Sequence, residues 1–225
     1  MTAMPLGGPT DSEPILARFL DELYRWNERV NLTSIPRANA ERRHLAEVRS
    51  LLQVVVPATG ARLVDIGSGG GVPGLVIAIL RPDLDVTLVE ADRRRAGFLL
   101  HAAALSGCRR VAVVPRRAEE VGHEPAHRER YDLAVSRATA PVATLCELAL
   151  PLLRVGGTLY AMVTDADTDV APSTVASVAC GGAAPEALTP GVLAVAKLCA
   201  TPSRFPRRSG VPARHPLGAA APRRA

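Results

Sequence analysis

The segment that most constrains this chain is a short apolar run that ends in a cluster of glycines. The run ARLVDIG (61–67) is typical of a buried strand, and the loop GSGGG (67–71) follows it directly. Glycine lets the backbone turn sharply and approach a ligand closely. Residues 72–80 are then expected to form a helix, whose first N–H groups suit an anionic group. A strand, a glycine loop and a helix in this order predict a ligand-binding site.

The rest of the chain alternates apolar runs with helical patterns. The runs expected to be strands are 85–91, 111–115, 131–137, 157–163 and 192–199. Nearly continuous apolar strands between helices predict a mostly parallel sheet with helices on both faces, an α/β fold of the Rossmann-like kind. Apolar residues at steps of three and four predict two helices before the first strand, at 15–30 and 39–55.

These patterns predict one main domain with extensions. We expect residues 1–14 to be a disordered lead-in and 15–60 to be a helical region packed on the core. The core and its basic C-terminal segment are expected over 61–217, and 218–225 are expected to be a disordered tail. The sequence shows no internal repeat and no second domain boundary.

An acidic residue lies about 20 residues after the glycine loop. Glu90 ends the second expected strand, 23 residues after Gly67, where a carboxylate can accept hydrogen bonds from both hydroxyls of a ribose. In a parallel sheet both positions lie beyond the carboxyl ends of the strands. The pair predicts a site for a nucleoside cofactor.

Two cofactors fit this pattern. Gly69, Gly71 and Gly74 satisfy the G-x-G-x-x-G spacing of dinucleotide-binding proteins. However, Gly67 is the first glycine of the turn, the loop contains Pro73, and little chain remains for the separate substrate domain of a dehydrogenase. S-adenosylmethionine needs only one domain. We therefore favour a methyltransferase, with an NAD-dependent dehydrogenase left open.

The charge of the chain is concentrated at its C-terminus. The whole chain has 27 basic and 22 acidic residues, but residues 203–225 contain six arginines and no acidic residue. Residues 1–202 therefore carry a net charge of −1. Such a tail favours a polyanionic partner. Because aromatic residues make up only 3% of the chain, RNA binding would have to depend on charge and shape rather than stacking.

Several classes of protein are excluded. No apolar stretch reaches the ~18–20 residues of a membrane span, and residues 1–14 lack the basic and apolar regions of a signal peptide. We expect a cytoplasmic protein without a membrane partner. The four cysteines form no C-x-x-C pair and the histidines no ligand pattern, so we expect free thiols and no metal site.

Several segments together resemble one family, the RsmG or glucose-inhibited division protein B family. The segments are YRWNERVNLTSI (24–35), RRHLAE (42–47), LVDIGSGGGVPGLVIAI (63–79), LVEADRRRAGFL (88–99), RRAEE (116–120), SRATAP (136–141) and FPRRSGVPARHPL (205–217). The resemblance implies a class I methyltransferase fold with an N-terminal helical extension. It also implies transfer of a methyl group from S-adenosylmethionine to guanine N7 in 16S ribosomal RNA. The sequence departs from the family at 46–48 and 163–169.

The resemblance also implies site residues. Its cofactor positions are Gly67, Val72, Glu90, Ala118, Glu119 and Arg137, and the glycine loop itself adds Gly69. Because the tail matches the family's ending up to Leu217, we expect it to present Arg207, Arg208 and Arg214 to RNA.

No residue is assigned as a catalytic acid or base, because guanine N7 attacks through a lone pair and carries no proton. The chain also lacks an Asp/Asn-Pro-Pro-aromatic step after the fourth strand and a Pro-Cys pair, which argues against amine and cytosine C5 methylation. We expect a monomer acting on 16S rRNA within a small-subunit particle. Two alternatives stay open: a methyltransferase with another nucleic-acid or small-molecule target, and a non-catalytic RNA-binding assembly factor.

Overall fold

The chain forms two compact units, Met1–Arg116 and Arg117–Ala225, in a computed structural model that describes residues 9–137, 139–163 and 170–218. The boundary falls inside the predicted 61–217 core. Residues 1–8 of the predicted lead-in, 219–225 of the predicted tail and most of the 163–169 departure lie outside the described residues. Among the helices of the described ranges, none is long and apolar enough to cross a membrane.

The first unit begins with helices whose bounds differ from the prediction. Helix α1 spans Pro9–Asn27, so residues 9–14 are helical and the predicted lead-in of 1–14 is wrong for them. The internal Pro14 does not end the helix. The single helix predicted at 39–55 is instead a 3-10 turn η1 (Arg37–Asn39), a π-helix η2 (Glu41–Ala46) and α2 (Glu47–Val54).

The sheet of the first unit contains three parallel strands. They are β1 (Arg62–Ile66), β2 (Asp85–Val89) and β3 (Val111–Val114), in the order β3-β2-β1. The connecting helices are α3 (Gly74–Leu80) and α4 (Arg93–Leu105). These bounds lie within about two residues of the prediction, because each strand lies in a short apolar run of the sequence.

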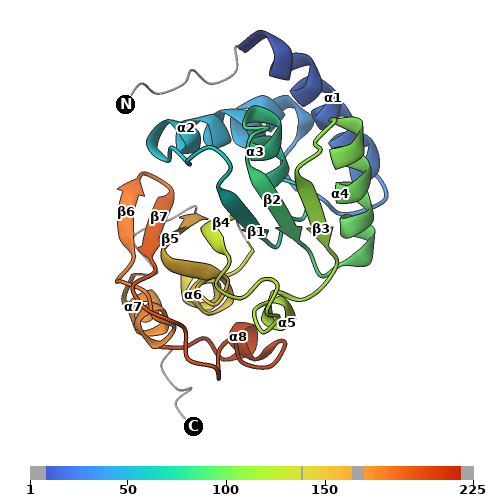
Figure 1. The fold of residues 1–225 in the computed structure, drawn as a ribbon. Helices are drawn as coiled ribbons and strands as arrows, with labels where there is room; N and C mark the ends of the chain where they lie inside the picture. Colours follow the sequence, from blue (N-terminus) through green and yellow to red (C-terminus); the bar gives the residue numbers. More distant parts are fainter. Residues whose placement is uncertain (1–8, 138, 164–169, 219–225) are drawn as a thin grey trace. The chain divides into compact units, whose positions relative to one another are not determined.

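Helix α1 packs against α3 and α4, as Figure 1 shows for α1 and α4. Leu16, Phe19 and Leu23 are fully buried, and the rings of Phe19 and Phe98 lie 6.5 Å apart between centroids. The predicted N-terminal helical extension is therefore part of the core of this unit. Its apolar face is held in place by the two helices that follow the glycine loop and Glu90.

The second unit contains a four-stranded mixed sheet in the order β4-β5-β7-β6. Its strands are β4 (Tyr131–Arg137), β5 (Leu153–Met162), β6 (Glu186–Thr189) and β7 (Val192–Ala196), and its helices are α5 (Ala118–Val121), α6 (Val142–Ala149), α7 (Val170–Ala179) and α8 (Val211–Arg214). Strands β4 and β5 are parallel, whereas β7 is antiparallel to both β5 and β6. The prediction missed β6, which is short and has no buried residue.

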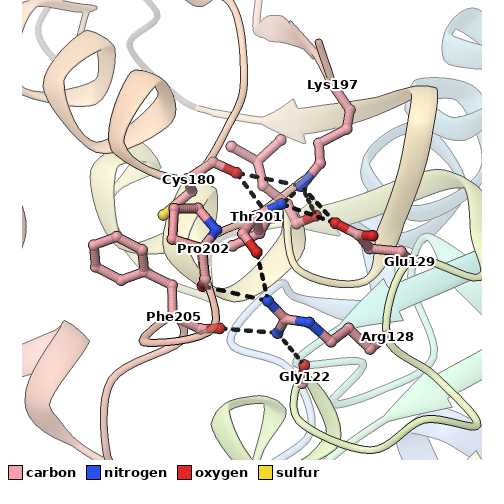
Figure 2. Close-up of polar contacts among 9 residues, drawn as sticks. Gly122, Arg128, Glu129, Cys180, Lys197, Thr201, Pro202 and Phe205 are labelled. Atoms are coloured by element: carbon pink, nitrogen blue, oxygen red, sulfur yellow. Dashed lines mark hydrogen bonds and ion pairs between the residues drawn. The ribbon is translucent and has the colours of Figure 1, made fainter. Parts of the chain in front are cut away.

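Polar contacts attach the C-terminal segment to the second unit (Figure 2). The guanidinium of Arg128 donates to four carbonyl oxygens, those of Gly122, Thr201, Pro202 and Phe205. The backbone N–H of Thr201 donates to Glu129 Oε1 at 2.8 Å. The path of the chain after β7 is thus fixed by hydrogen bonds to its backbone.

The only lysine of the chain, Lys197, lies beside these contacts and is buried. Its ammonium group donates to Leu150 O at 2.8 Å and to the hydroxyl of Thr201, and it lies 3.7 Å from Glu129 Oε1. Burial outweighs the attraction of Glu129 and lowers the pKa of Lys197 to about 8.

Candidate cofactor site

The glycine loop begins where β1 ends and is bonded to the end of β2. The N–H groups of Gly67 and Ser68 both donate to Val89 O, at 2.9 and 3.1 Å. Gly67, Gly69 and Gly71 have φ values of +70°, +50° and +80°. Residues with a Cβ rarely adopt this left-handed conformation, so the local backbone explains these three glycines.

The side chain of Glu90 joins the loop to the end of the second strand. The side chain is buried, and its carboxylate accepts hydrogen bonds from Gly69 N at 2.9 Å and from Asp92 N at 2.8 Å. A carboxylate has about four acceptor positions, so two backbone donors leave room for ribose hydroxyls. Glu90 therefore sets the loop geometry and can also bind a ribose.

The G-x-x-G part of the dinucleotide pattern has a structural explanation. The buried Asp65 accepts a hydrogen bond from Gly74 N at 3.0 Å. A Cβ at Gly74 would lie 2.5 Å from Asp65 Oδ2 and 2.6 Å from Leu88 Cδ2. Gly74 is therefore needed for close packing of α3 against the sheet, whatever ligand the loop binds.

Helix α3 does not provide the anion site that the sequence predicted at its start. The first N–H group, that of Gly74, is used by Asp65, and those of Leu75 and Ile77 donate to Gly71 O and Pro73 O. This expectation is corrected: a ligand here would meet the loop and Glu90 rather than the end of the helix. Val72, a predicted cofactor residue, is buried between the loop and α3.

The second unit contains the other predicted cofactor residues. Arg137 is the last residue of β4, and Ala118 is the first of α5. Glu119 is buried, and its Oε1 accepts hydrogen bonds from Arg117 Nη2 at 2.9 Å and Gly210 N at 2.8 Å. Burial alone would raise the pKa of Glu119, but these donors outweigh it and lower the pKa. Its carboxylate thus fixes the C-terminal segment, a role that the sequence did not indicate.

The three predicted RNA-binding arginines have different environments. Arg208 and Arg214 are exposed, as expected for residues that meet a large partner. Arg207 instead forms a buried ion pair: its Nη2 lies 2.6 Å from Glu147 Oε2, and its Nε donates to Glu147 Oε1 at 2.8 Å. Glu147 has no exposed surface. Arg207 therefore anchors the segment, and its contact with RNA stays a prediction.

A model of one protein family matches most of the chain. The family is rRNA small subunit methyltransferase G, and the match covers residues 12–188. Ribosomal RNA small subunit methyltransferase G of Roseiflexus castenholzii is 43% identical over an alignment of 212 residues that covers 89% of this chain and 90% of that protein. The protein of the same name from Symbiobacterium thermophilum is 39% identical over 88% of this chain and 87% of its own.

Solved structures show the fold at much lower identity. A variant of MtNAS in complex with S-adenosylmethionine matches with a TM-score of 0.56 and 14% identity, covering 84% of this chain and 76% of its own. TYW2 of M. jannaschii in complex with S-adenosylmethionine matches with a TM-score of 0.50 and 12% identity, over 68% of this chain and 72% of its own. The predicted Rossmann-like class I methyltransferase fold is confirmed. The chain belongs to the rRNA small subunit methyltransferase G family and is an S-adenosylmethionine-dependent methyltransferase.

Proposed function

We propose that this protein transfers the methyl group of S-adenosylmethionine to N7 of a guanine in 16S ribosomal RNA. The observation that carries the proposal is the pairing of the glycine loop with Glu90, through the 2.9 Å hydrogen bond from Gly69 N, in a chain of this family. The names of its relatives support small-subunit ribosomal RNA as the substrate.

The residues of the first unit fit the nucleoside part of the cofactor. Glu90 keeps acceptor positions for two ribose hydroxyls, while Gly67, Gly69 and Val72 are the residues predicted to lie beside the ligand. The family resemblance adds Ala118, Glu119 and Arg137 from the second unit, and these three stay predictions. In Glu119 both donors, Arg117 Nη2 and Gly210 N, bind Oε1, so the test must separate loss of a cofactor contact from loss of the contact with the C-terminal segment.

The reaction requires no general acid or general base from the protein. The cofactor supplies an electrophilic methyl group on a sulfonium sulfur. With the cofactor bound, the lone pair of guanine N7 would form the new N–C bond as the C–S bond broke, and the electron pair of that bond would stay on sulfur. No proton moves, so catalysis consists of aligning N7 with the methyl carbon and excluding other geometries. This agrees with a site built from backbone and one ribose-binding carboxylate.

RNA binding is assigned to the C-terminal segment, where Arg208 and Arg214 are exposed. With Arg204, which is also exposed, three arginines are still a modest basic surface, so we propose that the substrate is 16S rRNA within a small-subunit particle, whose shape completes recognition. The protein would act as a monomer in the cytoplasm. Full activity on protein-free RNA at physiological salt would contradict the requirement for a particle.

The proposal is tested with purified protein, labelled S-adenosylmethionine and small-subunit particles from cells that lack the enzyme. We expect calorimetric binding of S-adenosylmethionine but not of NAD, and label recovered as 7-methylguanine in 16S rRNA. If the cofactor binds but the label appears on another RNA or on a small molecule, that molecule is the substrate in place of 16S rRNA. Absence of binding to either cofactor would instead favour a non-catalytic assembly factor.

A further inference from the structure

The turn that follows α1 packs directly against the glycine loop. This turn, residues 28–35, belongs to the YRWNERVNLTSI segment, to which the reaction assigns no role. A Cβ added to Gly70 would lie 3.1 Å from Leu32 O in the turn and 3.0 Å from Leu23 Cδ1 in α1. The carbonyl of Leu32 therefore supports the middle of the loop that contains Gly67, Gly69 and Gly71.

The side chain of Asn27 holds the middle of this turn, while the hydroxyl of Tyr24 donates to Ile35 O at 2.8 Å at its far end. Asn27, the last residue of α1, accepts hydrogen bonds at Oδ1 from Leu32 N at 2.8 Å and from Thr33 N at 2.9 Å. Its Nδ2 donates to Thr33 O at 3.0 Å. Both ends of the amide are used, and every one of these partners is backbone of the turn. The position of Leu32 relative to α1 is thus set by Asn27.

The end of α1 is itself fixed on α4. The indole of Trp26 donates to Glu22 Oε1 at 2.8 Å, and His101 Nε2 lies 2.7 Å from the same oxygen. The rings of Trp26 and His101 are stacked with centroids 5.4 Å apart. Asn27 therefore projects from a rigid base, and a change at Asn27 should move the turn rather than the helix.

We propose that Asn27 is a positioning residue for the cofactor loop, acting through Leu32 on Gly70. The proposal rests on the proposed function, in which this loop binds S-adenosylmethionine. Gly70 follows Gly69, whose N–H donates to Glu90, so a shift of the turn changes the loop at the point where it meets the ribose-binding carboxylate. The segment is thereby assigned to cofactor binding rather than to RNA recognition.

The first test compares three variants by calorimetry with S-adenosylmethionine. Asn27→Ala removes all three hydrogen bonds and should weaken binding about tenfold, the size expected for losing roughly one net hydrogen bond. Asn27→Asp keeps the acceptor oxygen but not the Nδ2 donor and should weaken binding less. The control is Asn31→Ala, because Asn31 is exposed in the same turn, and it should bind like the unmodified protein.

A kinetic and exchange readout separates positioning from simple loss of stability. In Asn27→Ala the KM for S-adenosylmethionine should rise severalfold while kcat and the KM for the RNA particle change little. Amide hydrogen exchange at residues 68–71 should become faster at a temperature where both proteins are folded. If Asn27→Ala does not fold, Asn27→Ser replaces it, since its hydroxyl is too short to bridge to Leu32 and Thr33.

A double-variant cycle with Gly70→Ala tests the proposed route. Alone, Gly70→Ala should weaken cofactor binding because its Cβ forces Leu32 O away. In a protein that already carries Asn27→Ala, Gly70→Ala should weaken cofactor binding by a smaller factor than it does alone, because the turn is no longer held by Asn27. The role of Asn27 would be rejected if the two losses were additive, or if Asn27→Ala bound S-adenosylmethionine as tightly as the unmodified protein. Neither result would affect the proposed function. If the unmodified protein does not bind the cofactor, the proposed function fails first.

Discussion

At the scale of single residues, the cofactor loop depends on backbone conformation more than on side chains. Gly67 has a φ of +70°, and its N–H donates to Val89 O. Adding a Cβ there costs about 1–2 kcal/mol and reorients the peptide that faces the ligand. Gly67→Ala should therefore weaken binding of S-adenosylmethionine in calorimetry by roughly five- to thirtyfold or more. The control is Gly97→Ala in α4, where a Cβ meets nothing within 4 Å, and which should stabilise the fold by ~0.5–1 kcal/mol.

Glu90 is the single side chain on which the site depends most. Glu90→Ala should weaken S-adenosylmethionine binding by ~1–3 kcal/mol, because the ribose hydroxyls and the N–H groups of Gly69 and Asp92 all lose an acceptor. Glu90→Gln keeps one acceptor oxygen and should lose less. An effect on RNA affinity with unchanged cofactor affinity would mean that Glu90 has another role.

The strand, the glycine loop and the place of Glu90 at the end of the next strand were predicted from the sequence, because their signals are local. The strand, the loop and the acid lie within 30 residues of one another and follow the general rule for parallel sheets. The contacts of Asp65 with Gly74, Glu119 with Gly210 and Arg207 with Glu147 were not predicted. The last two join residues 60 or more positions apart, and no periodicity marks which acid a distant residue will meet.

At the scale of elements, the C-terminal segment is both an anchor and a basic surface. Arg207→Ala would leave the fully buried Glu147 without its ion-pair partner, which should destabilise the protein by about 3–5 kcal/mol in chemical unfolding. The exposed Arg208→Ala should change stability little and instead reduce the salt dependence of RNA binding by about one ion. Equal effects of the two variants on stability would contradict this division.

Two truncations test the anchoring and RNA-binding roles of the whole C-terminal segment. Removal of 218–225 should change activity little. Removal from Ser203 should weaken RNA binding and its salt dependence. The structure adds a second effect, since that cut also removes Phe205 O from Arg128 and Gly210 N from Glu119. It should therefore lower the thermal stability as well, and identical behaviour of the two truncated proteins would refute the assignment.

The predicted elements succeeded or failed according to whether an apolar run marks them in the sequence. Strand β4 has the predicted bounds, Tyr131–Arg137, because its apolar run ends at polar residues on both sides. The exposed β6 has no such pattern and was missed. The π-helix at Glu41–Ala46 buries His44 and Leu45. A pattern of apolar residues at steps of three and four does not distinguish such a turn from an ordinary α-helix, so it was not predicted.

At the scale of the whole molecule, one buried amine makes stability depend on pH. Folding lowers the pKa of Lys197 from 10.5 to about 8, chiefly through burial. Between these values the unfolded chain binds a proton that the folded protein does not, so this group makes stability rise with pH. Buried thiols such as Cys146 have a raised pKa and act in the opposite direction above about pH 9. The difference in free energy of unfolding between the wild type and Lys197→Met should therefore increase from pH 8 to 10. A difference that does not change with pH would contradict this prediction.

Methylation of guanine N7 in 16S rRNA is proposed for a protein whose cofactor loop is bonded to Glu90. The most direct measurement is reverse transcription across 16S rRNA after chemical cleavage at 7-methylguanine. It is made in cells with the protein, without it, and with the Glu90→Ala variant. We predict one cleavage stop that disappears in the deletion, returns with the unmodified protein and is weak with the variant. A stop that persists in the deletion would contradict the account.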